Sequence, residues 1–185
     1  AELSQTLTGA GRLQLSEAKV VNLNVLQEVF RRLSILPGLV ERLQARLPES
    51  SQPKLTARDT VFEPIALSVT AKDGALHFQE LRLTTDSFAM TGAGSVGFDG
   101  TLVSHPLLRI EPALSAAIIR SVEELQALTN TAGELEFPVV LQGRLPRVAV
   151  LPDLEYIAKR VLLKKTEELL TDFLKKALEP EGATN

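Results

Sequence analysis

Alternation with a period of two marks two regions of the chain as β-structure. In residues 7–15, leucines and glycines occupy the odd positions and polar or small residues the even ones, a pattern typical of a strand. The alternation returns over residues 61–110, where the sequence KDG at residues 72–74 predicts a hairpin turn. The apolar positions then change parity near Gln79, which predicts a β-bulge in the returning strand.

A period of about 3.6 residues separates these two regions and predicts helices. Asn24 is placed to cap a helix that ends at Pro37-Gly38, and a second apolar helix ends at Pro48. The polar segment that follows, ESSQPKLTAR at residues 49–58, is predicted to be a mobile loop.

The helical period occurs twice more, after the second β-region. Pro112 suits the first position of a helix whose apolar positions run out at Asn130. An alternating strand follows over residues 135–141, and Asp153 is placed to cap the last and longest helix. We expect the sheet to cover the apolar stripe of that helix, because each large side chain is worth roughly 1.5 to 3 kcal/mol when buried. Acids nearly balance its lysines, which disfavours an anionic membrane surface.

Glycines recur in two predicted strands. The segment TGAGSVGFDG at residues 91–100 has the G-x-G-x-x-G spacing that joins a strand to a helix in dinucleotide-binding proteins. Here the segment leads into a turn and another strand, so no helix N-terminus faces a phosphate. The letters TGAG also occur at residues 8–11. We interpret these glycines as structural, marking bends or a neighbour too close for a side chain: Gly9, Gly11, Gly92, Gly94 and Gly97.

Composition narrows the class of protein. The 185 residues are 44% apolar and 23% charged with a formal net charge of −3, which predicts one globular domain over residues 1–185. No broad positive field is present, so we expect no nucleic-acid partner. The chain has no cysteine, which excludes disulfides and thiolate chemistry.

Residues with catalytic chemistry are sparse. His77 and His105 lie in different predicted strands without a carboxylate cluster at metal-ligand spacing. No G-x-S-x-G turn is present to expose a nucleophilic serine. Paired acids such as Glu123-Glu124 fit solvated helix faces. We therefore expect a protein that is not an enzyme, with no cofactor and no metal.

Together these elements predict an α+β fold, in which a twisted, curved antiparallel sheet carries amphipathic helices on one face. Apolar residues that share the parity of the glycines are expected to line a concave groove: Leu13, Phe88, Met90, Val96 and Phe98. Alternation is the same whether a helix or an acyl chain covers the face. Two hypotheses therefore stay open, a lipid-handling domain with an open groove and a protein-interaction or capping domain whose own helices fill it. An enzyme that uses carboxylates is a distant third.

Three segments and their order resemble the C-terminal region of AsmA-like proteins: TGAGRLQLS at residues 8–16, TGAGSVGFD at residues 91–99 and FPVVLQGRLPRVAVLPD at residues 137–153. The resemblance implies a non-enzymatic domain in the periplasm of a Gram-negative bacterium, within a protein of outer-membrane assembly or of lipid transport and homeostasis. It implies an inner-membrane anchor, an N-terminal helix absent from this chain. Phospholipid or another envelope protein is the partner that it implies.

Overall fold

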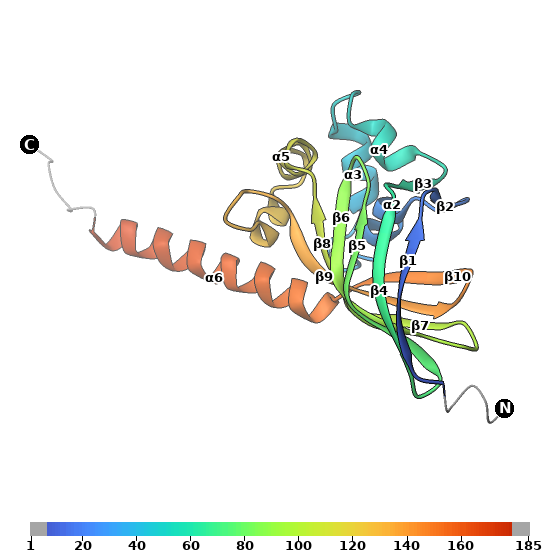
Figure 1. Cartoon of the computed structure of the whole chain (residues 1–185). Coiled ribbons are helices and arrows are strands. Elements are labelled where there is room, and N and C mark those ends of the chain that lie inside the picture. The colour runs from blue at the N-terminus through green and yellow to red at the C-terminus, as the bar shows by residue number, and fades with distance from the viewer. Residues whose placement is uncertain (1–6, 179–185) are drawn as a thin grey trace, which may run out of the picture.

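Eight strands form one antiparallel sheet, and two helical insertions lie at one end of it (Figure 1). The computed structural model describes residues 7–178. The strands follow the order β1-β4-β5-β6-β7-β9-β10, and β8 continues the line of β7 between β6 and β9. Their bounds are β1 (Gly9–Leu15), β4 (Ile65–Lys72), β5 (Ala75–Thr84), β6 (Phe88–Gly97), β7 (Thr101–Ser104), β8 (Leu107–Ile110), β9 (Glu136–Arg144) and β10 (Arg147–Pro152).

The first insertion follows β1 and is framed by a small two-stranded sheet. Its elements are β2 (Ala18–Val20), α2 (Val25–Arg31), α3 (Leu39–Arg46), α4 (Gln52–Thr56) and β3 (Thr60–Phe62). The second insertion follows β8 and contains α5 (Pro112–Ser121) and the 3-10 helix η1 (Glu123–Leu128). The last helix, α6 (Leu154–Leu178), follows β10. The predicted α+β fold, with a large antiparallel sheet and several helices, is confirmed.

Two local features that the sequence predicts, a turn and a bulge, set the register of the sheet. Lys72 pairs with Ala75, and the two turn residues Asp73 and Gly74 have φ values of 52° and 74°, which is the backbone of a tight hairpin turn. The register of β5 against β6 shifts between Phe78 and Leu81, which confirms the predicted bulge. The bulge returns the apolar positions of β5 to the face that the preceding residues occupy.

One face of the sheet, called here the inner face, carries buried side chains such as Phe78 and Leu81. It shares one hydrophobic core with the helices. Side chains of the helices and of the inner face belong to a single buried cluster that includes Val29, Leu43, Ile118 and Phe137. Asn24 caps α2, where its Oδ1 accepts a hydrogen bond from the backbone N–H of Gln27 at 2.9 Å. The core therefore lies between the helices and the sheet.

The segment 49–58 contains a helix, so the predicted loop is wrong for residues 52–56, which form α4. Pro53 stands in the first turn, where a proline costs no hydrogen bond. Leu55 is buried, and the side-chain amide of Asn24 donates to the carbonyl oxygens of Lys54 and Ala57 at 3.1 Å. These contacts depend on residues distant in the sequence, so the polar composition of the segment does not reveal them.

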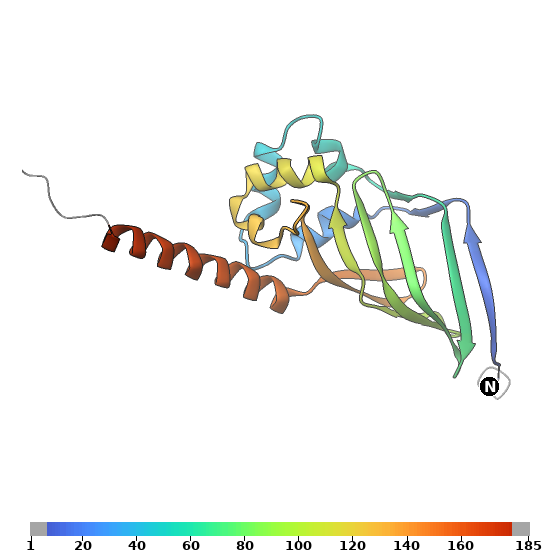
Figure 2. The ribbon, with the colours of Figure 1, turned by 60° about the vertical axis from the view of Figure 1, so that its left-hand side comes forward.

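Helix α6 leaves the domain instead of covering the sheet, as Figures 1 and 2 show. The Oδ1 of Asp153 caps it by accepting from the N–H of Tyr156 at 2.9 Å, as the sequence predicts. Ile157 is buried and Val161 half-buried against the domain. The next leucines on the helix are exposed by between 58% and 72%: Leu162, Leu163, Leu169 and Leu170.

The expectation that the sheet covers this apolar stripe is wrong. At 3.6 residues per turn, Ile157 and Val161 lie roughly on the opposite side of the helix from Leu163 and Leu170, and about a third of a turn from Leu162 and Leu169. The helix therefore packs on the domain with one side and leaves these four leucines exposed on its other sides. Among the residues described, no helix has both the length and the apolar character to cross a bilayer.

Candidate functional site

The inner face of the sheet, the candidate site, is filled near the helices. Phe88 and Met90 are only 4% and 1% exposed. The ring of Phe88 meets that of Phe62 edge-on, with centroids 6.2 Å apart. Phe88 and Met90 therefore do not line an open groove, because the protein's own side chains cover them.

The same face opens toward β1, the strand at the edge of the sheet. Leu13 lies opposite Leu67 in the register of β1 and β4, so both side chains project from one face. Leu13 is 46% exposed and Leu15, two residues further along the same face, is 54% exposed, while Leu67 is partly buried against the core. Three leucines thus form an accessible apolar strip, called here the open edge.

The remaining two predicted groove residues lie at the far end of the sheet from the helices. Val96 is partly buried against the core, where it pairs across the strands with Leu76 and Leu102. Phe98 lies in the turn after β6 and is 40% exposed. The five predicted residues therefore do not form one open groove, because the helices cover one part of the face and leave another free.

Leu15 and Leu67 belong to the open edge but are not among the five predicted groove residues. The sequence contains a signal for both residues, since Leu15 shares the parity of Leu13, and Leu67 alternates with the small and polar residues Ala66 and Ser68. The opposite face of the same strands carries small and polar residues, among them Arg12 and Ser68. The sheet is therefore two-faced at its edge.

Gly92 and Gly94 on β6 lie where neighbouring segments leave no space for a side chain. A Cβ on Gly92 would lie 2.6 Å from the Cα of Pro106. On Gly94 it would lie 2.5 Å from the carbonyl oxygen of Val103 and 2.9 Å from Cζ of Phe78. Both positions fit the predicted close approach, and the neighbours are the β7–β8 segment and an aromatic ring.

The first pair of glycines is different. A Cβ on Gly9 or Gly11 would meet nothing within 4 Å, so the interpretation of close approach is wrong there. The cause is their place on β1, whose described residues are exposed throughout. Gly97 is followed by a turn and by β7, which leaves no helix N-terminus for a nucleotide phosphate.

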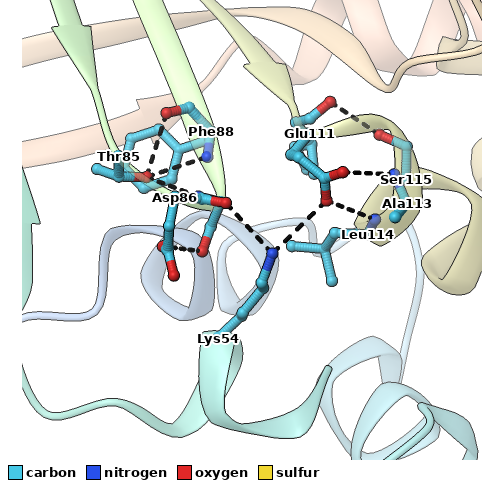
Figure 3. Close-up of polar contacts among 10 residues, drawn as sticks. Lys54, Thr85, Asp86, Phe88, Glu111, Ala113, Leu114 and Ser115 are labelled. Carbon is cyan, nitrogen blue, oxygen red and sulfur yellow. Dashed lines mark hydrogen bonds and ion pairs between the residues drawn. The ribbon is translucent and has the colours of Figure 1, made fainter. Parts of the chain in front are cut away.

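The helices of the two insertions, called here the helical cover, are held onto the ends of the strands by polar contacts (Figure 3). The Nζ of Lys54 on α4 donates to the carbonyl oxygen of Asp86 at 3.2 Å and lies 3.5 Å from Oε2 of Glu111. The carboxylate of Glu111 accepts from the N–H groups of Ala113 and Leu114 at 2.8 and 2.9 Å, which caps α5. These backbone donors, followed by Lys54, hold the pKa of Glu111 below its ordinary value.

The buried side chain of Ser115 also joins the second insertion to the sheet. The Oγ of Ser115 donates to the carbonyl oxygen of Ile110 and accepts from the N–H of Leu135, both at 3.0 Å. It joins the end of β8, helix α5 and the segment that leads into β9. The second insertion is therefore fixed to the sheet on both sides.

Titratable groups do not converge at the open edge. His77 and His105 are both exposed, and the described residues include no group of three or more His, Cys, Asp or Glu side chains that could hold a metal ion. The pKa of Asp99 is lowered to about 2 by the backbone N–H of Thr101, then by the Thr101 hydroxyl and by Arg144. This cluster stabilises the turn between β6 and β7.

The open edge is therefore an accessible apolar surface beside the part of the sheet that the helices cover. No family model, no curated protein and no solved structure matches the chain, so the proposal below depends on this surface and on the resemblance of the glycine-containing segments.

Proposed function

We propose that the chain is a non-enzymatic lipid-handling domain, which holds an acyl chain on the open edge while its helices close the other part of the sheet face. The observation that carries the proposal is the exposure of Leu13 and Leu15 beside Leu67, on the side of the sheet that elsewhere forms the core. A contiguous apolar surface of this kind is typical of an interaction or ligand site.

The cellular setting follows from the resemblance to AsmA-like proteins. We propose a place in the periplasm of a Gram-negative bacterium, in a protein of outer-membrane assembly or of lipid transport and homeostasis that is anchored in the inner membrane. The ligand in this setting is phospholipid. The two-faced edge supports the proposal, because an acyl chain needs an apolar side and the opposite polar side suits water.

A second candidate is a capping or protein-interaction domain. It is favoured by the burial of Phe88 and Met90 beneath the cover and by the Lys54 and Glu111 contacts that hold the cover in place. In this alternative, another envelope protein contacts the open edge in place of a lipid.

Lipid recovery from the purified chain tests the proposal. The chain is expressed in the periplasm of a Gram-negative host, purified, and extracted with organic solvent for mass spectrometry. The double variant Leu13→Asn, Leu15→Asn should lose bound phospholipid, because polar groups replace the apolar strip. The matched control Ala10→Asn, Arg12→Asn changes the opposite face of β1 and should keep it.

All three proteins should melt at similar temperatures, because these four residues are exposed. If the parent chain carries no more phospholipid than a blank purification, or if the inner-face variant carries as much as the parent, the lipid function is wrong. The capping alternative then becomes the better explanation of the open edge.

A further inference from the structure

A basic cleft of about 530 Å³ lies among α3, the C-terminal end of α5, η1 and the first half of α6. Figure 2 shows these helices on the side of the molecule away from β1. Among the described residues, five cationic side chains line the cleft: Arg42, Arg46, Arg120, Lys164 and Lys165. They outnumber the two carboxylates that the described part of the chain places there, those of Glu123 and Glu124, in a chain whose formal net charge is −3.

Two of the guanidinium groups are held in place by the protein. Nη1 and Nη2 of Arg42 donate to the two carboxylate oxygens of Glu124 at 3.0 and 2.9 Å, and this pairing lowers the pKa of Glu124. Nη1 of Arg46 donates to the carbonyl oxygen of Ser121, at the end of α5, at 3.4 Å. A guanidinium carries five N–H groups, so each retains donors that these contacts do not use.

Other cations of the cleft supply further charge. The Nζ of Lys164 donates to Oε1 of Gln126 at 2.8 Å, which joins α6 to η1. The side chains of Arg120 and Lys165 make no hydrogen bond within the described part of the chain. Positive charge therefore exceeds negative charge in a cleft whose walls come from four helices.

We propose that this cleft binds a phosphoryl group, carried by an anionic phospholipid headgroup or by free phosphate. A phosphate presents two or more oxygens at the spacing of a guanidinium fork, and arginine is the side chain best suited to it. A phosphomonoester carries up to two negative charges near neutral pH, which would offset most of the local excess. The proposal is independent of the open edge, since the two sites lie on different elements.

Isothermal titration of the whole chain with sodium phosphate, and flotation with phosphatidylcholine vesicles that contain phosphatidic acid, test the proposal. The variant Arg120→Gln, Lys165→Gln removes two positive charges on exposed side chains. The control Lys72→Gln, Arg82→Gln removes the same charge from exposed positions of the sheet. We expect the Kd to rise at least about tenfold in the cleft variant, as for the loss of charge-assisted hydrogen bonds, and to stay unchanged in the control.

The two probes separate the sources of the phosphoryl group. Saturable binding of free phosphate that is lost in the cleft variant supports a site for a soluble phosphate. Binding only to the phosphatidic acid vesicles, again lost in the cleft variant, supports a lipid headgroup. If neither probe binds saturably, or if the cleft and control variants weaken binding equally, the cleft is not a phosphoryl site. Vesicles of phosphatidylcholine alone control for attachment through the exposed leucines of α6.

Discussion

Gly11→Ala and Gly94→Ala make the same chemical change in two copies of the sequence TGAG, at sites with opposite surroundings. At Gly94 the new methyl group would lie 2.5 Å from the carbonyl oxygen of Val103 and 2.6 Å from Cβ of Ser104. Both contacts are shorter than folded proteins tolerate, so the adjacent strand has to move. At Gly11 the methyl group would meet nothing within 4 Å.

The two substitutions should therefore have different effects on the free energy of unfolding. Overpacking of a tight contact costs about 1 to 3 kcal/mol, so Gly94→Ala should destabilise the domain by that amount. Alanine in place of glycine in an unstrained backbone stabilises by about 0.4 to 1 kcal/mol, because it restricts the unfolded chain. Gly11→Ala should therefore be neutral or stabilising.

Urea unfolding followed by circular dichroism measures both variants against the parent. In a thermal melt, each 1 kcal/mol corresponds to about 2 to 4 °C for a domain of this size, so the two variants should melt several degrees apart. If Gly94→Ala unfolds at the same urea concentration as the parent, the close approach of the β7–β8 segment to β6 is wrong. Equal destabilisation by Gly11→Ala would contradict the open surroundings of β1.

Two further predictions concern the helices. Ile157→Ala should cost about 2 to 5 kcal/mol of unfolding free energy, as for other large buried side chains, whereas Leu169→Ala on the exposed part of α6 should cost little; equal effects in urea unfolding would show that α6 packs differently. Glu111→Ala should cost about 0.5 to 2 kcal/mol at pH 7, the usual effect of losing a helix cap. Because the folded-state pKa of Glu111 is lowered, its contribution is present above the unfolded pKa and is lost as the pH falls toward the folded value; the difference between parent and variant should narrow from pH 7 to pH 3, and a constant difference would contradict the role of the charged carboxylate.

Local chemistry made much of the fold predictable. The Asn24 and Asp153 caps, the Lys72–Ala75 turn and the β5 bulge each depend on residues within a few positions of one another, so the sequence pattern identifies them. Helix α4 depends on Leu55 entering the core and on contacts from Asn24, 30 residues or more away. A pattern confined to residues 49–58 does not contain that information.

The sequence predicts which face of the sheet is apolar, but not which part of that face the helices cover. Leu13 and Met90 each share the parity of the glycines in their own strand, which predicts that they lie on the same face of the sheet. Met90 nevertheless lies beneath the helices, whereas Leu13 is exposed. Alternation reports which side of a strand is apolar, while the cover depends on where distant helices pack. The two TGAG segments make the same point, since identical letters lie in an edge strand and in a crowded inner strand.

Photocrosslinking can show directly whether an acyl chain lies on the open edge. The purified chain is incubated with a phospholipid that carries a diazirine in its acyl chain, irradiated, and digested for peptide mass spectrometry. We expect adducts on the inner-face residues Leu13, Leu15 and Leu67, with few on Arg12 or Ser68 of the opposite face. Adducts confined to the exposed leucines of α6, or spread equally over both faces of β1, would contradict it.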